Sequence, residues 1–418
     1  MKEKKNIAFF LHGFPVISET FILNQIIALI DDGHHVDIYS MFNSGERKQH
    51  QKSIDYKLME RVVFLDSLPQ NRISKLKLFF SKIFRYPNLR DFLLFFSYIN
   101  YFISNKKKHI SFYNVIHFLG KPNYEIIHAH YGMTGNLVVN FKRIGLFKKA
   151  KLITTFHGFD FKVPYNGFYN NLFKVGNKFT VNTNYSKTKL VELNCPTEKI
   201  SILPVGLDIA DFNKPLINSP ELNHVFTIIF IGRLVEIKAP EIFLEICTQL
   251  KVQGKFQYKA IMIGDGNQKE LLNEKIKADA LTEIVIMTGV QTRDEIKTHL
   301  SNADVLIMTG REIDGLAETQ GLVIQEAQLF GLPVIIANVG GMREGIIENE
   351  TGFVVTANDI TAYVEKINLL QDNPELKNKM GAAAKQFVTE NYDSKILNKR
   401  LLEIYETELS SIKNNRQS

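Results

Sequence analysis

The stretch Phe226–Leu234, FTIIFIGRL, is an apolar run of strand length that ends at a glycine and an arginine. Similar runs alternate with helical patterns along the chain. Five precede this stretch (NIAFFLHG, HHVDIYSMF, EIIHAHYG, KLITTFHG and KFTVNTNYS) and five follow it (YKAIMIGDG, IVIMTGV, ADVLIMTG, LPVIIAN and GFVV). Alternating strands and helices predict an α/β fold of parallel sheets covered by helices, with functional loops at the carboxyl ends of the strands.

The alternation is interrupted once, at residues 206–222, which are rich in Gly, Pro, Asn and Asp. A chain of 418 residues is also too long for one typical core. We therefore predict two Rossmann-like domains, residues 1–205 and 223–390, that face each other across a cleft and are joined by this linker. Residues 391–418 are expected to form an amphipathic closing helix and tail that pack back on the first domain.

The composition is that of a globular protein, with 45% hydrophobic and 23% charged residues. The two cysteines, Cys195 and Cys247, form no close-spaced metal or redox motif, which fits a reducing cytoplasm without disulfides. The first apolar run, IAFFL, is interrupted by His12 and Gly13 before it reaches the length of a secretory signal. We therefore expect it to be the first strand.

Positive charge is concentrated in the first half of the chain. Residues 1–205 carry 29 Lys and Arg against 14 Asp and Glu, whereas the remainder carries 22 against 30. The two parts have formal charges of +15 and −8, within the total of +7. Such an asymmetry suggests that the first half meets a membrane surface, a phosphorylated substrate or nucleic acid. Because no nucleic-acid-binding motif accompanies it, we expect no nucleic acid.

Much of this charge lies in a basic and aromatic segment, residues 72–108, inside a predicted insert at about residues 68–112. The segment has nine basic residues and one acid, interleaved with phenylalanines and tyrosines. Its longest apolar run, FLLFFSYINYFI, is shorter than the roughly 20 residues that cross a bilayer. We expect peripheral contact with the anionic inner face of the cytoplasmic membrane. The alternative is a pair of core helices with solvated basic faces.

Seven motifs resemble those of one enzyme family. In chain order they are HGFPVISETF, TTFHGFD, VNTNYS, LPVGLD, FIGRLVEIKAP, IGDG and ETQGLVIQEAQLFGLPVI. They resemble the retaining nucleotide-sugar glycosyltransferases of the GT-B fold (group 1, family 4 type) over nearly the whole chain, and the first loop resembles the bacterial exopolysaccharide and capsule branch. The resemblance implies sugar transfer from a nucleotide-diphosphate donor on the second domain to a lipid-linked or oligosaccharide acceptor on the first.

Two glutamates, Glu318 and Glu326, flank a glycine in ETQGLVIQE. If residues 320–330 form a helix, the neighbours of Glu326 are apolar, and its carboxylate costs several kcal/mol unless hydrogen bonds compensate. Eight helical residues cover about 12 Å, of the order of the distance from donor sugar to ribose. The resemblance implies that Glu318 binds the sugar hydroxyls and Glu326 the ribose hydroxyls. Backbone amides at the helix start would face the diphosphate: Thr319, Gln320, Gly321 and Leu322.

Arg233 and Lys238 match the family's positively charged pair, which implies that they stabilise charge on the leaving diphosphate. The chain contains no Asp-x-Asp sequence, the pattern by which the other main glycosyltransferase fold carries its divalent ion. We therefore expect no metal and no cofactor, with the nucleotide sugar as co-substrate. The alternative for either residue is a solvated surface cation.

Several candidate residues follow predicted strands. His157 matches a family histidine close to the reacting sugar, and Asp160 is expected to cap or orient its loop. Gly13 lies in a loop expected to reach the donor phosphate or the acceptor, where HGFPVISET replaces the family's glycine pair. The nucleobase is expected to be lined by Gly264, Gly266 and Val290. Because His128 and His130 lack a third ligand cluster, we expect them to be structural residues at a strand end.

The family chemistry implies that the anomeric configuration is retained, by attack on the leaving-group face. No carboxylate can be placed as a nucleophile on the far face of the sugar. Two alternatives remain open at this point: a GT-B-like sugar-nucleotide epimerase, which would turn over the donor without an acceptor, and a non-catalytic nucleotide-sugar binding subunit.

Overall fold

The structure is a computed structural model and describes residues 3–16, 19–46, 50–67, 71–85, 112–212 and 225–414. Its contacts divide the chain into two compact units, which we treat separately. Unit 1 comprises Met1–Val181, Lys187–Leu203 and Asn398–Ser418, and unit 2 comprises Asn182–Ser186 and Pro204–Leu397. This division differs from the predicted ranges in assigning the short segment Asn182–Ser186 to unit 2, whereas most of the last helix belongs to unit 1.

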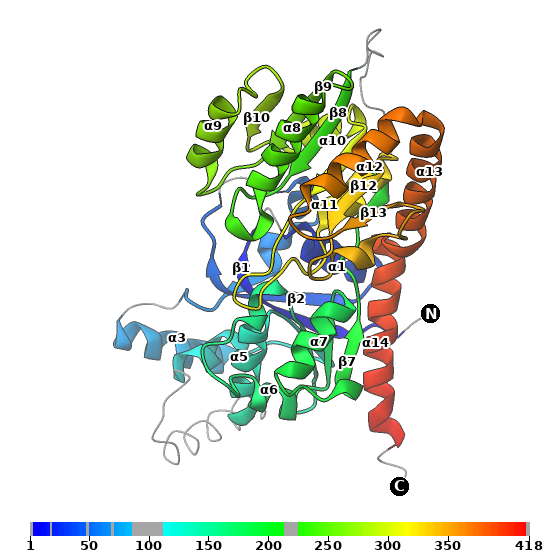
Figure 1. Cartoon of the computed structure of the whole chain (residues 1–418). Coiled ribbons are helices and arrows are strands. Elements are labelled where there is room, and N and C mark those ends of the chain that lie inside the picture. Colours follow the sequence, from blue (N-terminus) through cyan, green and yellow to red (C-terminus); the bar gives the residue numbers. More distant parts are fainter. Residues whose placement is uncertain are drawn as a thin grey trace. The chain divides into compact units, whose positions relative to one another are not determined.

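Unit 1 contains a seven-stranded parallel sheet with strand order β3-β2-β1-β4-β5-β6-β7. Strands β1, β2 and β7 of this sheet are labelled in Figure 1. The strands are β1 (Asn6–Phe14), β2 (His35–Asn43), β3 (Val62–Phe64), β4 (Ile126–His130), β5 (Lys151–Thr155), β6 (Lys178–Val181) and β7 (Ile200–Ile202). The helices are α1 (Thr20–Asp31), α2 (Gln51–Asp55), α3 (Arg72–Arg85), α5 (Gly132–Arg143), α6 (Asn170–Val175) and α7 (Asn184–Glu192), whose first residues belong to unit 2.

The inner strand β1 is buried on both faces, since Ile7, Ala8, Phe9, Phe10 and Leu11 are at most 2% exposed. A strand that helices cover on both sides reads as a continuous apolar run, and this explains the sequence NIAFFL. Beside β1 the strand order changes direction, because β2 lies on one side of it and β4 on the other.

Unit 2 contains a six-stranded parallel sheet with strand order β10-β9-β8-β11-β12-β13. The strands are β8 (Phe226–Ile231), β9 (Tyr258–Ile263), β10 (Val285–Gly289), β11 (Val305–Met308), β12 (Val334–Ala337) and β13 (Gly352–Val355). The helices are α8 (Pro240–Gln253), α9 (Lys269–Ala278), α10 (Arg293–Ser301), α11 (Leu322–Leu329), α12 (Ile360–Asp372) and α13 (Pro374–Asn391). The last helix, α14 (Ser394–Asn414), begins in unit 2 and continues in unit 1.

Strand β8 shows why FTIIFIGRL predicts this fold. Ile228 and Phe230 belong to one hydrophobic cluster, whereas Ile229 and Ile231 belong to another. Successive side chains of a strand point to opposite faces, so each face of the sheet has its own core. The predicted fold class, two parallel-sheet Rossmann-like units, is confirmed.

Two local predictions differ from the structure. The edge strand β3 was not predicted, because three half-buried residues show no usable periodicity. The helix predicted over residues 320–330 is shorter, and α11 begins only at Leu322. Gly321 has φ +74°, a left-handed conformation outside the helical range. The segment from Glu318 to Glu326 is therefore not helical throughout, contrary to the assumption behind the 12 Å estimate.

The described chain includes part of the predicted linker and insert. Residues 206–212 belong to unit 2, where Leu207 forms a parallel bridge with Asp393. The rest of the linker, from 213, lies outside the described residues, as do residues 86–111 of the insert. Both cysteines are buried and free.

Candidate functional site

Two loops at the carboxyl ends of β8 and β9 lie against each other in unit 2. The Leu234 N–H donates to the carbonyl of Asp265 at 2.9 Å. A Cβ at Gly264, where φ is +142°, would lie 1.9 Å from the Gly232 carbonyl oxygen, and one at Gly266 would lie 2.2 Å from that of Leu234. The backbones approach too closely for a side chain, so Gly264 and Gly266 have a structural requirement besides any role toward a nucleobase.

The third predicted nucleobase position, Val290, follows β10 and is 77% exposed. The neighbouring Gly289 carbonyl accepts a hydrogen bond from the Gly264 N–H at 2.9 Å. The three positions therefore lie along adjoining loops at one edge of the sheet. Arg233 is exposed on the first of these loops, between β8 and the short helix η6 (Glu236–Lys238).

The structure brings together two predicted catalytic residues, Lys238 and Glu318. The Lys238 ammonium forms an ion pair with the Glu318 carboxylate, and these side chains are 15% and 23% exposed. Burial raises the pKa of Glu318. The Lys238 charge and hydrogen bond, together with the amides of Gly321 and Gln320, outweigh burial and lower this pKa overall. Glu318 is therefore a carboxylate at neutral pH. It accepts hydrogen bonds from the Gln320 and Gly321 amides, which were predicted to face the diphosphate.

The segment between Glu318 and α11 is fixed by contacts within unit 2. The buried Gln320 side chain accepts from the Val205 N–H at 2.8 Å and donates to the Val205 carbonyl at 2.9 Å. The Thr183 hydroxyl donates to the Thr319 carbonyl at 2.9 Å. Because the Gln320 side chain is fully engaged here, its predicted role toward a donor is confined to its backbone.

Glu326 lies half-buried on α11, among residues that pack into apolar clusters: Leu322, Val323, Leu329 and Phe330. Burial raises the pKa of Glu326, and the charges of Arg293 and Lys297 on α10 oppose this rise. The Arg293 guanidinium and the Lys297 ammonium lie 5.2 and 5.5 Å from the centre of the Phe212 ring. No described residue makes a hydrogen bond to the Glu326 carboxylate, so it retains its capacity to accept hydroxyl donors.

In unit 1, His157, which follows β5, belongs to a row of buried histidines whose other members, His128 and His130, lie in β4. Its Nε2 lies 3.2 Å from Nδ1 of His130, whose ring stacks on that of His128 at 4.5 Å. The His128 nitrogens lie 2.7 Å from the hydroxyls of Tyr405 on α14 and of Thr155. Burial lowers the pKa of His157 to about 4, that of His128 to about 3, and that of His130 well below its usual range. The three rings are neutral at neutral pH.

Asp160 fixes the loop that carries His157, which confirms its expected orienting role. One carboxylate oxygen accepts from the His157 N–H at 2.8 Å and the other from the Gly132 N–H at 2.9 Å. The Tyr169 hydroxyl lies 3.4 Å from the second oxygen. Burial, only partly offset by these hydrogen bonds, raises the pKa of Asp160 to about 7. The sequence signal is the spacing of a capping box: Asp160 lies three residues after His157, which precedes a short helical turn.

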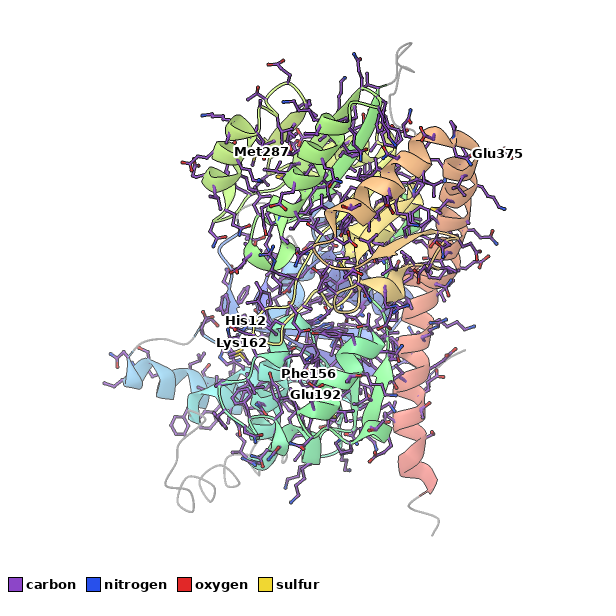
Figure 2. The ribbon with its side chains drawn as sticks, in the orientation of Figure 1. His12, Phe156, Lys162, Glu192, Met287 and Glu375 are labelled. Atoms are coloured by element: carbon purple, nitrogen blue, oxygen red, sulfur yellow. The ribbon has the colours of Figure 1, made fainter. Side chains whose placement is uncertain are left out.

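Gly13 lies at the end of β1 and lines a cavity of about 470 Å³. Two further lining residues, His12 and Lys162, are labelled in Figure 2. A Cβ at Gly13 would lie 3.1 Å from the Phe42 ring, so a larger residue there would crowd this wall. Ile17 and Ser18 of the HGFPVISET loop lie outside the described residues.

The described part of the chain contains no group of three or more His, Cys, Asp and Glu side chains placed to hold a metal ion. Among its helices, none combines the length and apolar character needed to cross a bilayer.

The two halves of the chain match two family models. Residues 18–211 match Glycosyltransferase Family 4, and residues 217–387 match Glycosyl transferases group 1. Among similar proteins, a Salmonella typhimurium relative named for colanic acid biosynthesis (WcaL) and the amylovoran biosynthesis glycosyltransferase AmsK of Erwinia amylovora are each 27% identical, over 96% of this chain and 99% of theirs.

Solved structures show the same fold. A glycosyltransferase from Rickettsia africae aligns with a TM-score of 0.70 at 21% identity, covering 97% of this chain and 99% of that one. Anabaena HepE in complex with UDP aligns with a TM-score of 0.69 at 16% identity, covering 96% of this chain and 100% of its own.

Proposed function

Because the chain belongs to the GT-B glycosyltransferases of group 1 and family 4, we propose that it transfers a sugar from a nucleotide-diphosphate sugar to a lipid-linked or oligosaccharide acceptor in cell-surface polysaccharide biosynthesis. The names of the WcaL and AmsK relatives, which the chain matches along its whole length, support this process. The observation that carries the enzymatic role is the Lys238–Glu318 ion pair at the carboxyl edge of the unit 2 sheet.

In the proposed reaction, Lys238 and the exposed Arg233 stabilise the negative charge that develops on the departing diphosphate. Glu318 accepts hydrogen bonds from the donor sugar, and Glu326 accepts them from the ribose. As the sugar–phosphate bond breaks, the acceptor oxygen bonds to the anomeric carbon on the same face. The acceptor proton passes to the leaving phosphate oxygen, so configuration is retained and every atom is accounted for.

Positive side chains replace a metal ion in this proposal. The lysine and arginine provide the charge that a divalent cation would otherwise place on the diphosphate. We expect activity to persist in EDTA, because this charge belongs to the protein. Complete loss in EDTA that magnesium or manganese restores would contradict the proposed leaving-group site.

The direct test incubates the purified full chain with a panel of nucleotide sugars and measures nucleoside diphosphate release, with and without a lipid extract. A transferase releases the diphosphate faster when the acceptor is present. A sugar-nucleotide epimerase converts the donor without any acceptor, and a binding subunit retains the donor without converting it. Each result selects one of the three functions.

We also place the protein in the cytoplasm, at the inner face of the membrane. Two free buried cysteines are compatible with a reducing compartment. The described part of the basic segment, α3, has the sequence RISKLKLFFSKIFR, with five basic residues and no acid. On this helix Ile73 is 63% and Phe84 80% exposed, an apolar surface suited to the lipid interface.

A further inference from the structure

Strand β4 ends in the sequence His-Ala-His, and the proposed reaction uses neither histidine. Both side chains are buried, with 0% exposure. His128 is engaged at both ring nitrogens, by the hydroxyls of Tyr405 and Thr155, and is a satisfied core residue. His130 differs, because its Nδ1 lies 3.2 Å from Nε2 of His157, while its Nε2 makes no hydrogen bond to a described residue. The polar contact of His130 is thus with the candidate site residue His157.

The geometry of the His130–His157 contact is that of a hydrogen bond between two imidazoles. The ring planes differ by only 13°, and the ring centres are 5.5 Å apart. This separation equals the N–N distance plus about the sum of the two ring radii, so both nitrogens lie on the line between the ring centres. Nδ1 of His130 and Nε2 of His157 therefore point at each other within nearly the same plane.

The orientation of the His130 ring is fixed by other rings packed against it. The His128 ring lies 4.5 Å from it with an interplanar angle of 28°, and the Phe9 ring of β1 lies 5.8 Å from it at 17°. His128 is in turn held by the Tyr405 and Thr155 hydroxyls. Because side chains in a close-packed core move only together with their neighbours, Nδ1 of His130 stays directed at His157.

The contact links the protonation of the two rings. Burial lowers the pKa of both His130 and His157, so both are neutral at neutral pH. A neutral imidazole has one N–H donor and one acceptor nitrogen. One ring must therefore donate and the other accept, and the tautomer of His130 determines which nitrogen of His157 carries the proton. It thereby also determines whether Nδ1 of His157 is a donor or an acceptor.

A role in the fold alone does not account for His130. Its Nε2 is buried without a described partner, and an unpaired buried polar atom lowers the free energy of unfolding. A phenylalanine, such as Phe9 on the adjacent strand, would fill a similar space without this cost. Buried polar groups that the fold does not need are typical of functional sites.

We propose that His130 is a positioning residue for His157: through the Nδ1–Nε2 hydrogen bond it holds the His157 ring and sets its tautomer, so that His157 enters the reaction in a single protonation state. This inference rests on the proposed transferase function, in which the family resemblance implies that His157 lies close to the reacting sugar. His130 itself is buried and acts only through His157.

The first test is ¹⁵N NMR of the histidine-labelled full chain without any substrate, with the His157 signals assigned by their loss in His157→Ala. His130→Phe keeps an aromatic ring but removes Nδ1, and we expect the His157 ring signals to shift. His130→Leu takes its place if the phenylalanine variant does not fold. His117→Phe is the matched control, since His117 is another buried histidine of unit 1 and lies outside this row. It should leave the His157 signals unchanged.

The second test measures nucleoside diphosphate release from the panel of nucleotide sugars, with the lipid extract present. We expect His130→Phe to lower kcat about tenfold, the effect of one lost hydrogen bond, with an unchanged donor KM. His130→Asn keeps a hydrogen-bonding atom near the position of Nδ1 and should restore kcat to within about threefold of the wild type. The loss in His130→Phe should disappear in a His157→Ala background, because His130 acts through His157.

Any of four results would overturn the inference: unchanged His157 signals in folded His130→Phe, full kcat in that variant, equal impairment of His130→Asn and His130→Phe, or an equal loss in the His157→Ala background. Unfolding midpoints of all variants, measured in the same buffer, exclude global unfolding as the cause of a lost activity. If the wild type turns over no donor, the proposed function fails, and the NMR comparison alone decides whether His130 sets the tautomer of His157.

Discussion

The two units handle charge in opposite ways at the carboxyl edges of their sheets. In unit 2, Lys238 and Glu318 are both charged and paired, and the pKa of Glu318 is lowered despite its burial. In unit 1, burial keeps His130 and His157 neutral and raises the pKa of Asp160 to about 7. An edge that binds a diphosphate needs fixed cations, whereas one that binds a sugar needs neutral hydrogen-bonding groups. This contrast is the one expected if unit 2 binds the donor and unit 1 the acceptor, as proposed.

The largest effect should appear between about pH 6.5 and pH 4, and it should be larger in unit 1 than in unit 2. Four histidines of unit 1 have lowered pKa values: His117, His128, His130 and His157. Below pH 6.5 these histidines bind protons in the unfolded chain, whereas in the folded unit they stay unprotonated down to about pH 4. The free energy of unfolding therefore falls as the pH falls through this window. For His157 alone the loss is about 3 kcal/mol. Hydrogen exchange of unit 1 peptides, corrected for intrinsic rates, should show the loss.

Asp160 provides the control for this acid effect, because its contribution to stability changes with pH in the direction opposite to that of the histidines. Its folded pKa, about 7, lies above the unfolded value, so between pH 7 and pH 4 the folded state carries the extra proton and gains stability as the pH falls. Asp160→Asn should therefore make the acid loss of protection in unit 1 steeper. Equal acid dependence of the peptides of both units would contradict the contrast.

The next largest effect is expected for Glu318→Gln, which tests the proposed donor site of unit 2. This change removes the charge that pairs with Lys238 and accepts the donor hydroxyls, a contribution of about 1.5–3 kcal/mol. We expect kcat/KM for transfer to fall about 10- to 100-fold while the unfolding midpoint shifts little. Glu350→Gln, on an exposed turn of the same unit, is the matched control. Near-normal transfer by folded Glu318→Gln would remove Glu318 from the site.

A smaller effect is expected at Glu326. Its carboxylate receives no hydrogen bond from the described residues, so Glu326→Gln leaves no protein partner unpaired and changes only what a ribose would contact. The KM for the donor should rise about tenfold with little change in kcat, because ribose contacts are present in both ground and transition states. A normal donor KM in a folded variant would show that Glu326 serves the fold alone.

The sequence predicted features that depend on local pattern. Residues Ile228 to Ile231 predicted a strand covered on both faces, because all four are apolar. Glu326 was identified as a candidate site residue because it is an acid within an apolar stripe. Features that depend on contacts between residues far apart in the sequence could not be predicted. Nothing near Gln320 indicates that its side chain pairs with Val205, 115 residues away. Likewise, nothing near Glu19 indicates that its carboxylate accepts a hydrogen bond from Tyr131, which lies 112 residues later in the chain.

The smallest expected effect concerns the charge asymmetry between the two parts of the chain, +15 against −8. On α3 the exposed Lys77 lies on the same helical face as Ile73 and Phe84, four residues after the first and seven before the second. If this face meets an anionic membrane, Lys77→Gln should weaken binding to anionic vesicles about fivefold, since one lysine near such a surface contributes about 1 kcal/mol.

Co-sedimentation with phosphatidylserine vesicles at two salt concentrations measures the Lys77 effect, and Lys255→Gln, an exposed lysine of unit 2, is its control. The difference between wild type and Lys77→Gln should shrink at the higher salt concentration, because the interaction is screened. Donor binding should be the same in all three proteins, since the proposed donor site belongs to unit 2. If Lys77→Gln and Lys255→Gln sediment alike, this face of α3 does not contribute to membrane binding, and α3 is an ordinary element of unit 1.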